Sequence, residues 1–295
     1  MDLKIKRNLH TIKKVKFISN TKNAIREEKL KNYTRAYNLF LNSQNQCKSE
    51  LTAIKIISRR AFCLEQVGNH KEAENLILSL TKKYKNFYQS YLLTGLYYGK
   101  LKKYKESKKY LIQGLNYFPN VMDLYITLSY TLKDTERWNE AIDVLKKALN
   151  IHDLVRSKNG IEKKDIWCEL GHLYFDRANY NSCIACLKQA LILDNGILAC
   201  YSTLSRAYLF LDDAGNSIKY LDLQYEKFNF LDTEDYIIKA RAHSRLNQIE
   251  EAKICITNAY DESGSLFLRS EDMADFSDLL KIGFFSGLEN LEIEE

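Results

Sequence analysis

The chain has 295 residues and a formal net charge of +6 at pH 7, with 45% hydrophobic and 28% charged residues. One proline and 11 glycines are too few for a linker-rich or sheet-rich protein, so we expect helices throughout. No apolar run approaches the roughly 20 residues that a bilayer-spanning helix needs, and no apolar segment of a signal peptide follows the basic N-terminus. We therefore expect a cytoplasmic protein without membrane insertion.

The N-terminal residues 1–16 form a basic arm. Its Lys and Arg residues outnumber its single Asp, and this net positive charge nearly accounts for the charge of the whole chain. Such an arm could contact nucleic acid or an acidic membrane surface. Because it lacks interleaved aromatic residues, we favour a solvated, mobile terminus and expect no nucleic-acid partner.

From residue 17 onward, small residues recur at two positions of a repeated pattern, the eighth and the twentieth. The successive separations are 37, 34, 34, 42, 34 and 35 residues in both series. Two antiparallel helices approach closely only where both lack bulk, so a small pair at each crossing is a packing requirement. The first series is Ala24, Ala61, Gly95, Ser129, Gly171, Ser205 and Ala240, and the second is Ala36, Ala73, Ser107, Ala141, Cys183, Ser217 and Ala252.

Large residues fill complementary positions, with aromatic or aliphatic residues at the fourth and eleventh positions and an apolar residue at the twenty-fourth. This phase predicts seven repeats, of which the first is degenerate and either caps the array or docks the basic arm. Insertions interrupt the period near 51–53 and 156–163, and the second is expected to form a polar loop. The repeats are residues 17–50, 54–87, 88–121, 122–155, 164–197, 198–231 and 233–266.

The segment 267–295 follows a break around Gly264 and is expected to form a C-terminal capping helix with an acidic tail. Its apolar residues have helical spacing and would cover the exposed end of repeat seven. They are Met273, Phe276, Leu279, Leu280, Phe284 and Phe285.

The clearest copy of the pattern runs from Trp167 through Leu170, Gly171 and Tyr174, followed by Ala190. It resembles the tetratricopeptide signature W-x2-L-G-x2-Y. The resemblance implies an all-α fold, an α-solenoid of about seven helix-turn-helix repeats wound into a right-handed superhelix and closed by a capping helix. It also implies a protein-binding scaffold.

In proteins that this chain resembles, positions 2, 5, 9 and 12 of each first helix line a concave groove for a peptide or a partner's helix. The apolar positions would bind side chains of the ligand, while Arg206 and Arg241 would favour an acidic residue near repeat six. No repeat has the Lys and Asn pair of co-chaperones that clamp chaperone C-termini, so that role is disfavoured. The groove residues implied are Leu92, Leu96, Ile126, Tyr130, His172, Phe175, Arg206, Leu209 and Arg241.

Two cysteine arrangements allow a chemical interpretation. Cys183 and Cys186 form a CxxC pair that could serve redox or zinc chemistry, but Cys183 holds a small-residue position, so packing is favoured. Cys168 and His172 lie one turn apart, where a metal pair or a nucleophile and base could stand, although an exposed groove histidine is commoner. The scattered odd number of cysteines indicates reduced thiols.

No phosphate-binding loop, HExxH, GxSxG or paired-carboxylate motif is present, so we expect no enzyme, no cofactor and no metal. The favoured interpretation is a scaffold or adaptor that binds a peptide or helical segment of a partner protein in its groove. The alternative is a partner-responsive regulator of transcription or signalling without its own DNA-binding domain, because 16 residues ahead of repeat one are too few for one. A redox enzyme using the CxxC pair is a third hypothesis.

Overall fold

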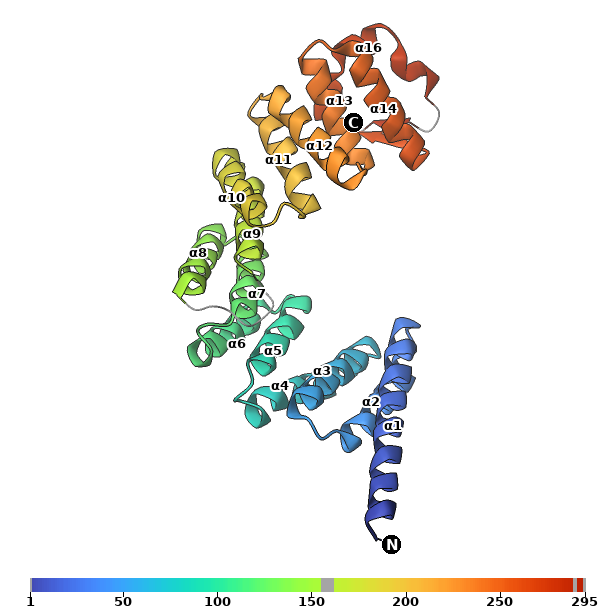
Figure 1. Cartoon of the computed structure of the whole chain (residues 1–295), viewed down its shortest axis with the longest axis vertical. Coiled ribbons are helices and arrows are strands. Elements are labelled where there is room, and N and C mark those ends of the chain that lie inside the picture. Colours follow the sequence, from blue (N-terminus) through green and yellow to red (C-terminus); the bar gives the residue numbers. More distant parts are fainter. Residues whose placement is uncertain (1, 155–161, 289–290, 294–295) are drawn as a thin grey trace. The chain divides into compact units, whose positions relative to one another are not determined.

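The structure is a computed structural model and describes residues 2–154, 162–288 and 291–293. It divides into two compact units, Met1–Ile161 and Glu162–Glu295, which are described separately here. Helices in tandem pairs make up most of both units, and among the described residues the only sheet has two short strands (Figure 1). The predicted all-α solenoid of repeats is confirmed.

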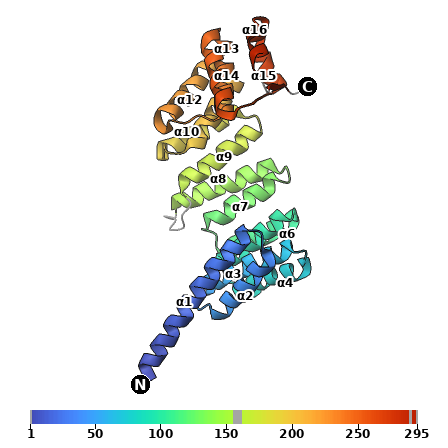
Figure 2. The ribbon, with the colours of Figure 1, turned by 90° about the vertical axis from the view of Figure 1, so that its right-hand side faces the viewer.

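The first unit consists of antiparallel helix pairs, each with a first and a second helix joined by a short turn (Figure 1). The helix α1 begins at Asp2, so the predicted basic arm is helical and continues into repeat one without a break. Figure 2 shows the start of α1 extending beyond the helices that pack on its other end. The pairs are α1 (Asp2–Lys29) with α2 (Tyr33–Gln46), α3 (Glu50–Gln66) with α4 (His70–Lys83), α5 (Tyr88–Lys100) with α6 (Tyr104–Tyr117), and α7 (Met122–Lys133) with α8 (Trp138–Leu154).

The second unit continues with the same kind of pairs and ends in a compact C-terminal segment. Its pairs are α9 (Lys163–Asp176) with α10 (Tyr180–Leu193), α11 (Leu198–Phe210) with α12 (Ala214–Phe228), and α13 (Thr233–Arg245) with α14 (Ile249–Ser263). The C-terminal segment comprises β1 (Leu266–Leu268), α15 (Ser270–Asp275), α16 (Ser277–Lys281), the 3-10 helix η1 (Phe284–Gly287) and β2 (Leu291–Ile293).

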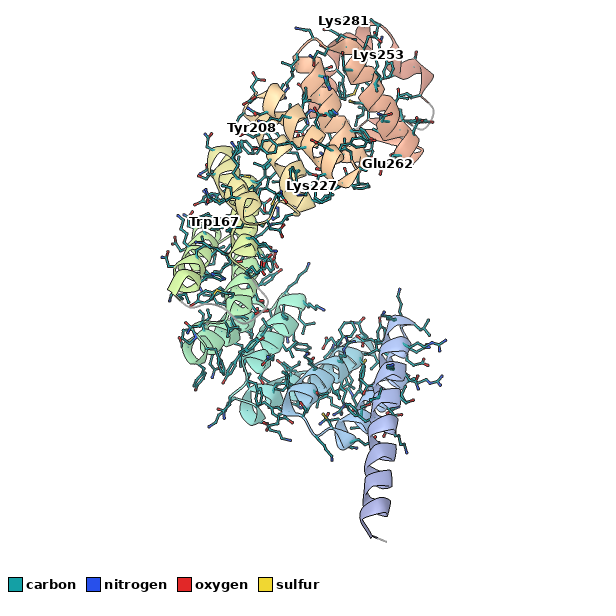
Figure 3. All side chains as sticks on the ribbon, in the orientation of Figure 1. Trp167, Tyr208, Lys227, Lys253, Glu262 and Lys281 are labelled. Carbon is teal, nitrogen blue, oxygen red and sulfur yellow. The ribbon has the colours of Figure 1, made fainter. Side chains whose placement is uncertain are left out.

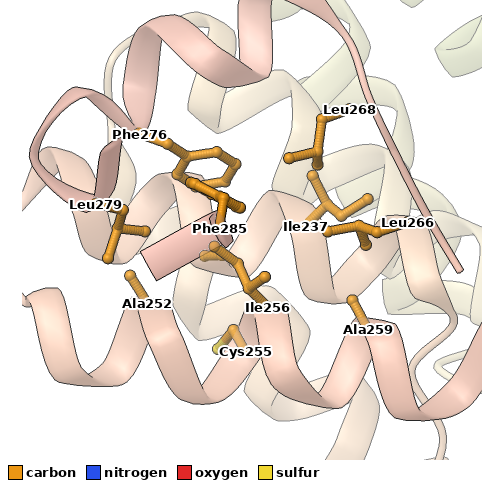
Figure 4. Packing of buried hydrophobic residues seen from close by; sticks show 11 residues of the cluster. Ile237, Ala252, Cys255, Ile256, Ala259, Leu266, Leu268, Phe276, Leu279 and Phe285 are labelled. Carbon is orange, nitrogen blue, oxygen red and sulfur yellow. The ribbon is translucent and has the colours of Figure 1, made fainter. Parts of the chain in front are cut away.

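The C-terminal segment corrects the prediction of a single capping helix. The strands β1 and β2 pair in parallel, with Leu266 opposite Leu291, and two short helices and a 3-10 turn connect them. Phe276 and Phe285 are buried against Ile256 of α14 (Figure 4). Except for Leu280, which is exposed, the predicted apolar residues therefore cover the end of repeat seven as expected, although the backbone that carries them is not one helix.

The fourteen small residues of the two series are all buried, as the packing argument requires. A Cβ on Gly95 would lie 2.6 Å from the side chain of Leu111, and a Cβ on Gly171 would overlap Leu187 in the same way. At another crossing the hydroxyls of Ser205 and Ser217 are 2.8 Å apart and share a hydrogen bond. Close approach of the paired helices thus depends on these positions.

Every helix pair turns through one residue in the left-handed region, and these residues share the fifteenth position of the pattern. The N–H of the following residue donates to the carbonyl five residues earlier, as from Lys103 to Tyr98 at 2.9 Å, which is a Schellman ending of the first helix. Only Gly68 is a glycine. The other members are Lys31, Lys102, Glu136, Ala178, Asp212 and Asn247, with φ between 54° and 61°.

The large residues pack between neighbouring repeats. Trp167 of α9 and Tyr208 of α11 contact the same buried cluster, which includes Leu187 and Leu204 (Figure 3). The insertion near 51–53 forms part of the first turns of α3, whose N-terminus is capped by Ser49. The polar loop predicted near 156–163 lies largely outside the described residues.

Candidate functional site

The first helices of each unit contact one another directly, α3 with α5 and α5 with α7 in the first unit, and α9 with α11 and α11 with α13 in the second. We call the surface that they form the first-helix face of that unit. All nine predicted groove residues lie on these helices, Leu92 to Tyr130 in the first unit and His172 to Arg241 in the second. They therefore make two sets, one on each unit.

The first-helix face of the first unit contains an open pocket of about 410 Å³ between α1, α3 and α5, with one residue from α4. This volume falls in the range of about 300–1,000 Å³ typical of ligand pockets. The predicted residue Leu96 lines the pocket and is 40% exposed. The lining residues are Glu28, Lys55, Ser58, Arg59, Phe62, Ile77, Leu93, Leu96, Tyr97 and Lys100.

The charges at this pocket are mostly positive. Arg59 forms an ion pair with Glu28 at 2.6 Å, which neutralises one of the three cations. The ammonium of Lys100 lies 5.4 Å from the centroid of the Phe62 ring, and Lys55 is exposed. No acidic side chain pairs with Lys55 or Lys100 among the described residues, so two cations remain available to a ligand.

Tyr97 forms a fixed wall of the pocket. Its hydroxyl donates to Glu65 at 2.7 Å, and burial together with this hydrogen bond raises the pKa of Tyr97 well above its ordinary value. The phenol therefore stays neutral, and its donor is already engaged. What the wall offers a ligand is the apolar ring.

The other predicted residues of the first unit differ in accessibility. Tyr130 is 43% exposed and Leu92 is half-buried, whereas Ile126 keeps only 9% of its surface. Because α5 contacts α7, Leu96 and Tyr130 belong to one face. Ile126 contributes to the packing beneath that face more than to its surface.

The first-helix face of the second unit presents aromatic rings with a guanidinium. Arg206 lies 5.1 Å from the centroid of the Phe175 ring. Phe175 in turn packs edge-on against Tyr180 and Phe210, whose own rings are stacked at 4.9 Å. Arg206 also approaches Glu234 at 3.6 Å. This predicted cation is therefore already held by a ring and a carboxylate.

The prediction for Arg241 is wrong, because this side chain is not available to a ligand. It is 4% exposed and binds Asp272 at 2.8 Å and Asp275 at 2.6 Å, both on α15. Leu209 is buried as well. The acidic preference expected near repeat six consequently loses one of its two cations, and this arginine instead fastens the C-terminal segment to α13.

The cysteines serve packing in this structure. Burial raises the pKa of Cys183 to about 12, so its thiol is protonated at neutral pH. Cys168, which the sequence placed with His172, has its sulfur 3.3 Å from that of Cys200 on α11, and both side chains are buried. Among the described residues, no three His, Cys, Asp or Glu side chains are grouped so that they could hold a metal ion.

Sequence reasoning missed Lys55, Phe62 and Lys100, although a signal for two of them was present. Lys55 and Phe62 occupy positions two and nine of repeat two, which are two of the four groove positions; Leu96 stands at position nine of repeat three. Glu28 also stands at a groove position, the twelfth of repeat one, but Arg59 does not, and the ion pair that joins α1 to α3 through them could not be read from position.

In the described residues, seven tandem helix pairs with a small pair at every crossing define an α-solenoid of helix-turn-helix repeats. The tetratricopeptide repeat model matches residues 88–121 and 164–196. The chain is a tetratricopeptide repeat protein.

Solved structures support the same fold. The pilus biogenesis factor PilW is 14% identical with a TM-score of 0.58, covering 77% of this chain and 98% of PilW. A tetratricopeptide repeat protein from Parabacteroides merdae is 9% identical with a TM-score of 0.53, covering 91% of this chain and 99% of its own. YrrB, described as having an unusual peptide-binding site, is 12% identical with a TM-score of 0.53, covering 69% and 97%.

No curated protein matches the sequence significantly. Within the described residues, none of the helices combines the length and the apolar character that crossing a membrane requires.

Proposed function

We propose that this protein is a non-catalytic adaptor that holds a peptide or helical segment of a partner protein against its first-helix faces. Tetratricopeptide repeats serve in general as protein-binding scaffolds, and this chain has their fold. The observation that carries the proposal is the open pocket between α1, α3 and α5. There Leu96 and the half-buried Phe62 and Leu93 leave apolar surface uncovered beside two lysines that have no acidic partner in the described part of the chain.

The exposed face continues beyond the pocket. Tyr130 on α7 adds a large, half-exposed aromatic ring to the same face, and rings of this kind dominate the binding energy of many protein interfaces. In the second unit, Phe175, Tyr180 and Phe210 provide a further aromatic surface with Arg206 beside it. Apolar anchors flanked by polar groups are what a bound segment requires for affinity and for orientation.

The test is affinity capture of partners by the full chain, followed by binding measurements with two matched variants. Leu96→Glu places a charge on the first-helix face, and Ile112→Glu places one on the second helix α6 at nearly the same exposure, 40% against 37%. A partner segment bound as proposed loses affinity for Leu96→Glu by tenfold or more, about 1.4 kcal/mol, and binds the Ile112 variant like wild type. Equal binding of both variants, or loss confined to Ile112→Glu, would show that the first-helix face of the first unit is not the binding surface.

A further inference from the structure

We propose that the pocket between α1, α3 and α5 recognises an acidic segment of a partner protein, in which a large apolar side chain is flanked by side-chain carboxylates. The inference rests on the proposed function, since it specifies the chemistry of a ligand on the same face. It also moves acidic recognition from repeats six and seven, where the buried Arg241 of repeat seven cannot supply it, to repeats two and three.

The apolar part of the ligand follows from the floor of the pocket. Ile77 is fully buried at its base, Phe62 and Leu93 are half-buried, and Leu96 is exposed at the edge. These side chains come from α4, α3 and α5, so the apolar surface is a concave patch shared by neighbouring repeats. Covering it with an apolar side chain removes that surface from water, which is the main source of affinity in such pockets.

The acidic part follows from the charges. Lys55 on α3 and Lys100 on α5 both line the pocket, and neither has an acidic partner among the described residues. Glu28 already pairs with Arg59, which leaves an excess of two positive charges around an apolar floor. Exposed pairs of this kind add little affinity each, but they select ligands of opposite charge and accelerate their association.

A protein ligand fits these residues better than a nucleic acid does. Three of the five apolar or aromatic lining residues are aliphatic, and one of the two rings, Phe62, already has the Lys100 ammonium over it, whereas single-stranded nucleic acids are bound by aromatic rings on which successive bases stack. The carboxylate of Glu28 also lines the pocket and would repel a phosphate backbone. A short segment with spaced carboxylates can place its charges at the lysines and avoid Glu28.

The experiment selects ligands from a phage-displayed library of random peptides on the full chain and measures the best peptides, fluorescein-labelled, by anisotropy and stopped flow. We expect the selected peptides to carry Leu, Ile, Met or Phe next to Asp or Glu. Lys55→Glu with Lys100→Glu should weaken their binding at least about tenfold, mainly through slower association, and the loss should shrink in high salt. Leu96→Ser should instead speed dissociation.

The matched control is Lys71→Glu with Lys105→Glu, which changes the net charge equally on exposed positions of the second helices α4 and α6. This variant should bind the peptides like wild type. Binding that is unchanged by amidation of the peptide C-terminus assigns recognition to side-chain carboxylates. Loss of binding on amidation would overturn that part of the proposal.

Three results would overturn the pocket as the site. If selected peptides bind the lysine double variant and the Leu96 variant like wild type, the pocket proposal fails. The adaptor proposal then depends on the first-helix face of the second unit. If no peptide is selected and a captured partner also ignores Leu96→Glu, the first-helix face of the first unit fails as the binding surface in both proposals. If a single-stranded oligonucleotide, but no acidic peptide, binds through Lys55 and Lys100, the site recognises phosphates instead.

Discussion

Gly95 and Gly99 stand one turn apart on α5, and replacing each by alanine should have opposite effects on stability. A Cβ at Gly95 would lie 2.6 Å from Cδ2 and Cγ of Leu111, whereas a Cβ at Gly99 would meet only the Ser107 hydroxyl at 3.6 Å, an ordinary contact. Leu111 is fully buried and cannot withdraw into solvent. Overpacking of this kind costs about 1–3 kcal/mol.

Alanine in place of glycine in a helix contributes up to about 1 kcal/mol, and this gain applies to both variants. Gly99→Ala should therefore be more stable than wild type by up to about 1 kcal/mol, and Gly95→Ala should be less stable by about 0–2 kcal/mol. Because both substitutions restrict the unfolded chain equally, their difference of about 1–3 kcal/mol isolates the crossing.

Urea denaturation of the full chain, followed by far-ultraviolet circular dichroism, measures this difference. Native-state hydrogen exchange of the α5 and α6 amides then locates it, which matters because repeat arrays need not unfold in one step. Gly171→Ala repeats the test in the second unit, against Leu187. If Gly95→Ala proves as stable as Gly99→Ala, the small residues are not required by helix packing, and the phase of the repeats loses its physical basis.

Four further outcomes are expected. Lys102→Gly should raise the melting temperature, with a gain of about 0.5–1 kcal/mol, because a left-handed φ of 56° strains a side-chain-bearing residue; a lower melting temperature would contradict this. Asp123→Asn should stabilise the protein by up to about 1 kcal/mol at pH 7, since burial raises the pKa of Asp123 and one of its buried oxygens has no hydrogen-bond partner in the described part of the chain. Because its pKa is raised in the native state, Asp123 holds a proton there more readily than in the unfolded chain. The destabilisation by the charged carboxylate is therefore full above the raised pKa and absent below the ordinary pKa of an aspartate. Melting curves near pH 3 should accordingly show no gain in stability for Asp123→Asn. Arg241→Leu should cost about 3–5 kcal/mol by leaving the buried Asp272 carboxylate without its charged partner, while Asp275 keeps Arg245, and limited proteolysis should then cut the C-terminal segment first. A thiol reagent should modify the half-buried Cys47 well before the buried cysteines, and equal rates at all seven would show that the packing is looser than described.

The repeat phase could be predicted because it depends on residue size at fixed positions. Gly95 and Ser205 are small for a reason that the spacing alone reveals, and both lie buried at the crossings. The left-handed turns were less visible. Gly68 marks one of them, but Lys102 and Ala178 adopt the same conformation although neither residue type favours a positive φ, because the Schellman hydrogen bonds and the packing of the pair outweigh local preference.

The C-terminal segment illustrates what spacing could not show. Phe276 and Phe284 have helical spacing, but Gly283 between them takes a φ of 66°, and Asp272 turns back to bind Arg241. The same ion pair removed Arg241 from the candidate site. The position of a residue within a repeat identifies the helix face on which its side chain lies. It does not reveal an ion-pair partner from a segment outside the repeats, such as Asp272.

The ion pairs between α13 and α15, with Phe276 and Leu279 beside them, also bear on how copies of this chain meet. An uncovered last repeat would present the apolar surface that a further repeat normally buries, and the first repeat of another copy could stack on it. Such head-to-tail stacking extends into filaments wherever the rotation between copies does not close a ring. The charged and folded C-terminal segment occupies that place, so the apolar surface of repeat seven that a further repeat would bury is already covered.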